Sequence, residues 1–122
     1  MIRLTATLLS LLLLASPAAS AKKRVKFPPG RTTVILKSKT TVSTAEVYVL
    51  RARKGQRMTL HLTSTSKKAV FTIFPPDWHP TQDASNVTEW DGELPQTGDY
   101  EIWVSPRDES GDTAFTLEVT VR

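Results

Sequence analysis

Apolar and polar residues alternate most regularly at the C-terminal end of the chain, between Thr97 and Arg122. The apolar positions are Tyr100, Ile102, Val104, Phe115, Leu117, Val119 and Val121. Successive side chains of a strand point to opposite faces, so a period of two with one apolar set predicts strands with one buried face. The polar loop between the two runs predicts a hairpin. Since a lone hairpin is marginal in water, the rest of the chain must supply the opposite wall of a core.

Four earlier stretches also have the composition of strands, and a fifth is weaker. They are Thr32–Lys37, Ala45–Arg53, Arg57–Ser64, Ala69–Phe74 and, more weakly, Asn86–Leu94, with an interruption expected at Gly92. Ser38–Thr44 fits an edge strand or a loop. The turn Lys54-Gly55-Gln56 predicts a second hairpin. The continuous apolar run Ala69–Phe74 predicts a central strand, whereas the prolines of 75–85 exclude a strand there.

These strands and turns predict the fold class. No stretch after the first segment shows apolar residues at helical spacing. About seven to eight short strands separated by regular turn signals are typical of an all-β protein, an antiparallel β-sandwich of two sheets.

The first segment is expected to be a targeting signal. Met1–Ala21 contains Arg3, then the apolar run Leu8–Ala15, then the small residues Ala19-Ser20-Ala21. This order predicts a secretory signal peptide with its cleavage site. A membrane anchor is the alternative, but a span needs about 20 apolar residues and this run is shorter. Cleavage leaves residues 22–122 as a single domain, periplasmic or secreted and no longer held in a membrane.

Cysteine content and charge narrow the class of protein. The chain has no cysteine, and an exported domain without disulfides, resting on its apolar core alone, is typical of a bacterial envelope protein. Nearly all Lys and Arg precede Ala69, and every acidic residue except Glu46 follows Pro76. Either the two halves neutralise each other side by side, or they form a bipolar surface that steers a charged partner. No aromatic residue is interleaved with Lys22-Lys23-Arg24, so nucleic acid is not an expected partner.

The sequence shows no catalytic motif. It lacks cysteine, a G-x-S-x-G elbow and H-E-x-x-H. Asp91 and Glu93 could form a carboxylate pair like that of glycosidases, but a solvated strand face explains them as well. We therefore predict a non-catalytic binding module without a cofactor. The one metal alternative is calcium held by Asp108, Glu109 and Asp112.

Two tryptophans suggest where a partner binds. Trp103 falls on the polar face of its strand, so either a neighbouring loop covers it or it is an exposed aromatic residue of the kind found at interfaces and sugar platforms. Trp78 and His79 lie on the proline-rich segment. Trp78, His79 and Trp103 are therefore candidate partner-binding residues. The partner would be a protein or, as the alternative, cell-wall carbohydrate.

Two motifs carry a family resemblance. One is Tyr48-x-Leu50 followed by Lys54-Gly55-Gln56; the other is Thr97-Gly98-x-Tyr100. Together they resemble the bacterial pre-peptidase C-terminal (PPC) domains. The resemblance implies a β-sandwich of jelly-roll topology that binds or targets and does not catalyse.

Within that fold, the chain also resembles the periplasmic inhibitors of goose-type lysozyme. Val25-x-Phe27-x-x-Gly30 leads, at similar spacing, to Tyr48 and the turn 54–56. The resemblance implies a protein that blocks the cleft of a cell-wall-degrading enzyme with its loops. That family has arginines where this chain has Trp103, Asp108 and Asp112, and only Arg107 lies nearby. The resemblance therefore adds Arg107 to the candidate partner-binding residues Trp78, His79 and Trp103.

Overall fold

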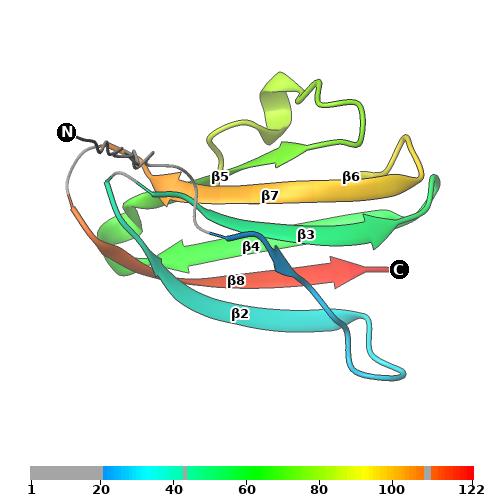
Figure 1. Cartoon of the computed structure of the whole chain (residues 1–122), viewed down its shortest axis with the longest axis horizontal. Helices are drawn as coiled ribbons and strands as arrows, with labels where there is room; N and C mark the ends of the chain where they lie inside the picture. Colours follow the sequence, from blue (N-terminus) through cyan, green and yellow to red (C-terminus); the bar gives the residue numbers. More distant parts are fainter. Residues whose placement is uncertain (1–20, 43, 109–110) are drawn as a thin grey trace, which may run out of the picture.

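The protein is an all-β sandwich, as the alternation predicted. The computed structural model describes residues 21–42, 44–108 and 111–122, and these contain eight strands in two four-stranded sheets packed face to face (Figure 1). The predicted signal peptide, Met1–Ala21, lies outside the described residues except for Ala21. None of the described residues forms a helix long and apolar enough to cross a membrane.

The first sheet has the strand order β1-β3-β7-β5 and the second the order β2-β8-β4-β6. The strands are β1 (Lys23–Arg24), β2 (Thr33–Thr40), β3 (Glu46–Ala52), β4 (Arg57–Ser64), β5 (Ala69–Phe74), β6 (Glu89–Glu93), β7 (Gly98–Pro106) and β8 (Thr113–Val121). Two short 3-10 turns, η1 (Thr65–Lys67) and η2 (Gln82–Ala84), are the helical elements of the described chain. All strand pairs are antiparallel except β1 with β3.

The connections between strands differ from the prediction. From β2 to β8, each strand lies in the opposite sheet from the one before it, which is the jelly-roll arrangement. Both predicted hairpins are therefore wrong: β7 pairs with β3 and β5, and β8 pairs with β2 and β4. Two strands that cover the same core from opposite sheets alternate in the same way as two strands of a hairpin. The period of two cannot distinguish the arrangements.

Two further details of the strands correct the sequence reading. The apolar strand β5 is not central but lies at the edge of its sheet. On its free side it forms one isolated bridge, in which Phe71 N donates to Val87 O (2.8 Å) and Val87 N donates to Phe71 O (3.0 Å). The strand β6 continues through Gly92 without the expected interruption.

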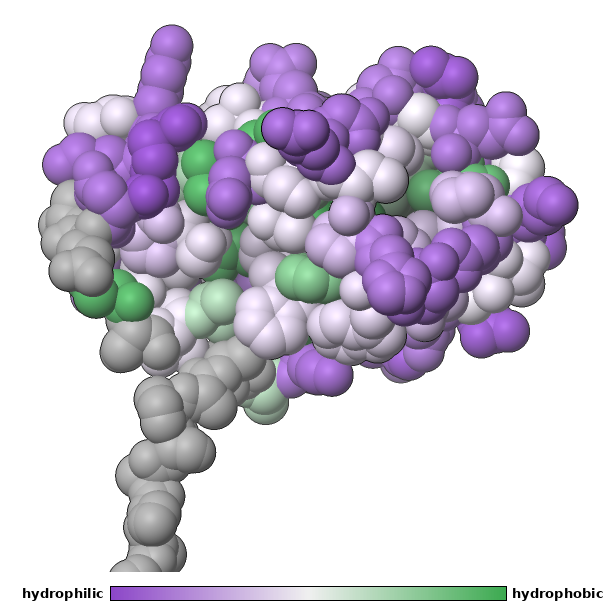
Figure 2. All heavy atoms as spheres, turned by 90° about the horizontal axis from the view of Figure 1, so that it is seen from above, coloured by the Kyte–Doolittle hydropathy of each residue, from purple (hydrophilic) through white to green (hydrophobic). Residues whose placement is uncertain are grey.

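The core lies between the sheets, and the predicted register holds. The most deeply buried large side chains of this core are Leu50, Met58, Leu60, Phe71, Leu94, Tyr100, Ile102, Val104, Leu117 and Val119. Six of the seven apolar positions at the C-terminal end are buried, and Val121 packs against the core at its margin. In the view of Figure 2, polar residues (purple) project from the surface and apolar residues (green) lie mostly in recesses between them.

The two family motifs meet at one end of the sandwich. Lys54 N donates to Thr97 Oγ1 (2.9 Å), so the turn after β3 is bonded to the turn before β7. The buried Tyr100 donates its hydroxyl to Gln96 O (2.6 Å) and accepts a bond from Gln96 N (3.1 Å). The motifs therefore hold two connections together.

Gly98 of the second motif gives a test of this structural role. Its φ is +151°, and a Cβ there would lie 2.9 Å from Cγ of Pro76, whereas Gly55 has φ +93° and open space around it. Gly98→Ala is expected to lower the free energy of unfolding by roughly 2 kcal/mol or more, and Gly55→Ala by about 1 kcal/mol, because only the first adds a clash to the backbone strain. Urea unfolding of both variants checks this. Equal losses would show that Pro76 moves aside freely.

Some of the basic residues in the first half of the sequence pair with acidic residues of the second half in the fold. Lys22 Nζ lies 2.9 Å from Glu101 Oε2, and Arg24 Nη2 lies 3.1 Å from Asp99 Oδ2, because only β3 separates β1 from β7 in the first sheet. In the second sheet, β4 and β6 are paired, and Arg57 Nε lies 2.9 Å from Asp91 Oδ1. Of the two readings of the charge distribution, the structure favours mutual neutralisation.

Candidate functional site: loops at two ends of strand β7

The structure brings two of the predicted partner-binding residues together. Phe74 lies between Trp78 and Trp103, with ring centroids 5.1 Å and 5.6 Å away. Trp103 is half-buried and donates from Nε1 to Glu101 Oε1 (3.0 Å), so it is partly covered rather than free on the surface. Trp78 is 49% exposed, and Lys22 Nζ lies 5.8 Å from its ring centroid. The result is an aromatic cluster of three residues on the outer face of the first sheet.

The geometry of this cluster does not suit a flat sugar platform. The Phe74 ring is inclined by 40° to that of Trp78 and by 63° to that of Trp103, so the three faces share no plane. Trp78 has φ +62°, which is unusual for a bulky residue. His79 is exposed beside it and donates its backbone N–H to Asp77 Oδ1 (3.0 Å). That hydrogen bond is the main reason why the pKa of Asp77 is lowered.

Arg107 lies apart from the aromatic cluster. Along the β5–β7 pair, Phe74 stands opposite Glu101 and Ala69 stands opposite Pro106, so Arg107 is beyond the far end of this ladder. Its backbone N–H donates to Lys68 O (2.6 Å), and its Nε donates to Lys67 O (3.3 Å). The predicted four-residue site is therefore divided between two places.

At the Arg107 end, two loops form a cationic tip, which we define as Lys67, Lys68 and Arg107. The β4–β5 loop is strained there, since Ser66 and Lys67 both have φ +55°. Side-chain and backbone bonds hold it: Ser64 Oγ accepts from Ala69 N (3.0 Å), and Thr65 O accepts from Lys68 N (3.2 Å). Strain of this kind persists only where the surroundings determine the conformation, and it is common at binding sites.

A hollow of about 370 Å³ adjoins the cationic tip. Its lining residues are His61, Leu62, Thr63, Ser64, Lys67, Thr88, Glu89 and Arg107. His61 Nδ1 lies 3.6 Å from Glu89 Oε2 on one wall, and Lys67 and Arg107 form the other charged groups. Among the described residues, no carboxylate forms an ion pair with Lys67, Lys68 or Arg107. The tip can therefore offer its cations to a partner.

The contact between Lys67 and Arg107 was missed by sequence reasoning. Ser64–Lys68 has the composition of an ordinary polar turn, and the two residues are 40 positions apart. The adjacent lysines of this turn are a weak signal, because nothing in the sequence shows which loop they face.

The carboxylates of β6 do not form a catalytic pair. Asp91 and Glu93 are exposed on the outer face of the second sheet. Asp91 accepts two bonds from Arg57, at 2.9 Å and 3.0 Å, and one from Thr59 at 3.1 Å. The bond from Arg57 is the largest cause of its lowered pKa. Asp91 is thus held as a salt-bridged anion on an open sheet and not in a cleft.

The calcium alternative receives no support from the described part of the chain. Within it, no three His, Cys, Asp or Glu side chains are grouped so that they could hold a metal ion. Asp108 and Asp112 belong to this part, whereas Glu109 lies outside the described residues.

A buried carboxylate lies inside the fold rather than at a site. Glu46 is 7% exposed, accepts a hydrogen bond from Ser38 Oγ (2.7 Å) and forms an ion pair with Lys23 Nζ. Burial, with the nearby charge of Glu46, raises the pKa of Tyr48 to about 12. These groups are neutralised within the protein, so we assign them to the stability of the edge where β1 joins β3.

Comparisons with known proteins identify solved structures of the same fold. No protein-family model and no curated protein matches the chain. Among solved structures, PliG of Aeromonas hydrophila, a periplasmic inhibitor of g-type lysozyme, superimposes with a TM-score of 0.73 and 26% identity, covering 86% of this chain and 99% of that one. The chain has the fold of these inhibitors.

Two other solved structures extend the comparison. PliG of Salmonella Typhimurium, also a periplasmic g-type lysozyme inhibitor, gives a TM-score of 0.65 at 17% identity, covering 85% of this chain and 100% of that one. The pre-peptidase C-terminal domain of a Bacillus anthracis collagenase gives 0.57 at 13% identity, covering 84% and 95%. Both parts of the resemblance inferred from the motifs, to the PPC domains and to the lysozyme inhibitors, are therefore confirmed for the fold.

Proposed function

We propose that this protein is an exported, non-catalytic inhibitor of a goose-type lysozyme. The observation that carries the proposal is the similarity to the Aeromonas hydrophila inhibitor, which extends over 99% of that chain with a TM-score of 0.73. The predicted signal peptide and the absence of cysteine agree with an envelope protein that meets a cell-wall-degrading enzyme outside the cytoplasm.

The cationic tip supplies the chemistry for such binding. Enzymes that cleave glycosidic bonds generally carry carboxylates along their clefts. Arg107 can bind a carboxylate through two parallel N–H donors, and Lys67 adds a second positive charge beside it. The bond from Arg107 Nε to Lys67 O fixes the two loops relative to each other, so less conformational entropy is lost when they enter a cleft. The tip is therefore the proposed inhibitory element.

The proposal is tested with the mature chain, residues 22–122, and a goose-type lysozyme acting on a suspension of purified peptidoglycan. We expect the rate of clearing to fall to zero as the protein approaches a molar excess, and calorimetry to show a 1:1 complex. A chicken-type lysozyme serves as the control enzyme. Sedimentation of the protein with peptidoglycan alone separates inhibition of the enzyme from shielding of its substrate.

Two outcomes would contradict the proposal. One is an unchanged clearing rate in excess protein together with no heat of binding. The other is slowed clearing with every enzyme tested and co-sedimentation with peptidoglycan, which would identify a carbohydrate-binding module instead.

A further inference from the structure

We infer that the free edge of β2 is a docking site for an extended, acidic segment of another protein, which would add to the second sheet as a further strand. Strand addition of this kind gives affinity through main-chain hydrogen bonds and selectivity through alternate side chains. The inference concerns a different surface from the cationic tip and does not depend on lysozyme inhibition.

The edge of β2 is the longest open edge among the described strands. All eight residues of β2 are in register with β8, and none of the other described strands lies on its second side. Figure 1 shows β2 near the lower margin of the molecule, with β8 above it. In the first sheet, one edge is the two-residue β1, and the other, the six-residue β5, is bridged at Phe71 to Val87.

The backbone of β2 presents donors and acceptors to this open side. Val121 N donates to Thr32 O (2.9 Å), so the backbone groups of Thr32 point to β8. In an antiparallel pair, successive residues point alternately to the partner and away from it. The N–H and C=O groups of Thr33, Ile35, Lys37 and Lys39 therefore point to the open edge. These are four donors and four acceptors available to an added strand.

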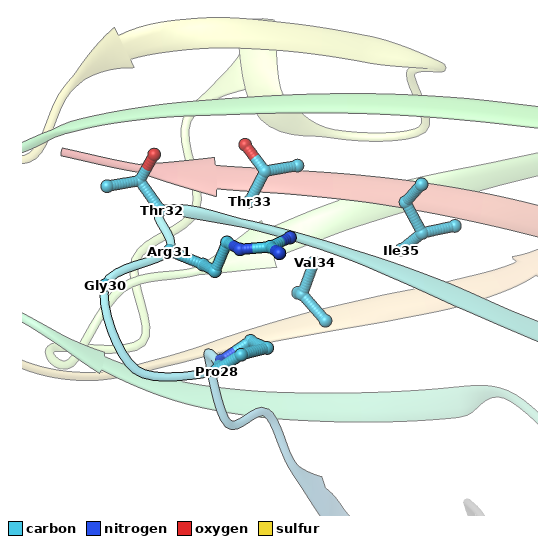
Figure 3. A pocket seen from close by; sticks show the side chains of 7 residues that line it. All are labelled: Pro28, Gly30, Arg31, Thr32, Thr33, Val34 and Ile35. Atoms are coloured by element: carbon cyan, nitrogen blue, oxygen red, sulfur yellow. The ribbon is translucent and has the colours of Figure 1, made fainter.

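The side chains on this edge also suit an added strand. Ile35 is 57% exposed, which is high for a large aliphatic residue. Next to it, the turn from Pro28 to Arg31 and the start of β2 line an open hollow of about 480 Å³. Figure 3 shows Val34 pointing towards this turn, with the side chain of Arg31 extended beside the strand, while Thr33 and Ile35 point to the other side. Ile35 shares its exposed face with Lys37 and Lys39, so the methylene groups of a glutamate on that face of the added segment would cover it, while apolar side chains on the other face would lie beside Val34.

The charges of the edge indicate which segment fits. Arg31, Lys37 and Lys39 have no ion-pair partner among the described residues, and β2 carries no acidic residue. Lysines at an edge commonly prevent a strand from pairing with its own copy, and here an antiparallel β2–β2 pair would bring like charges together. The same lysines favour a strand that carries carboxylates.

The acidic edge strand of a second copy is a less suitable occupant. The carboxylates of β6 are partly used within their own molecule, since Asp91 is bound by Arg57 and Thr59 and Glu89 lies 3.6 Å from His61. A strand from another protein, with unpaired carboxylates at alternate positions, gives the better complement to Lys37 and Lys39.

The test uses a fluorescein-labelled peptide of alternating glutamate and valine, Ac-EVEVEVE-NH₂, with the lysine peptide Ac-KVKVKVK-NH₂ as its control. We expect only the acidic peptide to bind, with amide shifts in the NMR spectrum concentrated in residues 33–39. The double variant Lys37→Glu/Lys39→Glu is expected to lose at least about tenfold in affinity for the acidic peptide and to gain affinity for the basic one.

A second variant examines the backbone alone. Ile35→Pro removes an N–H that points away from β8, so it is expected to reduce binding while leaving the bonds between β2 and β8 in place. If this variant does not fold, the charge exchange still decides the question. The inference is overturned if neither peptide binds, if the shifts lie outside β2, or if the double variant binds the acidic peptide unchanged. Sedimentation showing dimers of the unmodified protein that the double variant loses would identify a second copy as the occupant and would also overturn it.

Discussion

Arg107→Glu is expected to weaken inhibition of a goose-type lysozyme by more than about 30-fold, which corresponds to about 2 kcal/mol of binding free energy. The reason is that Arg107 extends from the cationic tip with no ion-pair partner among the described residues, and reversing its charge would place a carboxylate against those of the enzyme's cleft. The inhibition constant, measured from peptidoglycan clearing, is the readout. The inhibition constant of Arg107→Lys should lie between those of the unmodified protein and Arg107→Glu, because lysine keeps the charge and loses the planar pair of donors.

The matched control for this variant is Arg53→Glu. Arg53 is also exposed, but it belongs to the turn between β3 and β4, at the opposite end of the sandwich from Arg107. Both variants change the net charge by the same amount, so a loss confined to Arg107→Glu would locate the contact at the tip. Equal losses would mean that only the overall charge attracts the enzyme. No loss in either variant would remove Arg107 from the inhibitory element.

Phe71→Ala is expected to lower the free energy of unfolding by about 3–5 kcal/mol, a large part of the 5–15 kcal/mol typical of a domain. Phe71 is 0% exposed and lies in the core between the sheets, and its backbone carries the bridge to Val87. Removing the ring leaves a cavity that the surrounding strands cannot fill. Denaturant unfolding followed by circular dichroism measures the loss.

Phe74→Ala is the control for Phe71→Ala, because it removes the same ring from the same strand. Phe74 is only half-buried and contacts Trp78 and Trp103 on the outer face, so its loss should be clearly smaller. A larger loss for Phe74→Ala would mean that the aromatic cluster, and not the interior of the sandwich, supplies most of the stability. If Phe71→Ala does not fold, Ile102→Val at another fully buried position gives a milder reduction of the same kind.

The strands and their buried faces could be predicted because those properties are local. In β4, Met58, Leu60 and Leu62 are buried, as their alternation with polar residues predicted. The bounds of β4 and β5 also agree with the prediction. Proline content excluded a strand after Phe74, and the structure has turns and η2 there.

The candidate site could be predicted only in part. Trp78 and Trp103 were both recognised as unusual, but their common neighbour Phe74 was not, since Phe74 ends an apolar run that looks like core. Arg107 was recognised through the family resemblance. Its contact with Lys67 depends on how β5 and β7 are aligned, and that alignment is a long-range property.

By itself, the sequence determined which residues form strands and which side of each strand is buried. The reason is that the alternation of apolar and polar residues can be recognised over a few consecutive positions. Only the tertiary structure decided that β3 and β4, and likewise β7 and β8, lie in opposite sheets. It also decided that Lys22 and Arg24 pair with acidic residues of β7, and that the lysines of β2 lie on an open edge without an ion-pair partner among the described residues. The physical reason is that strand partners are chosen by the packing of the whole core, which a local pattern of side chains does not record.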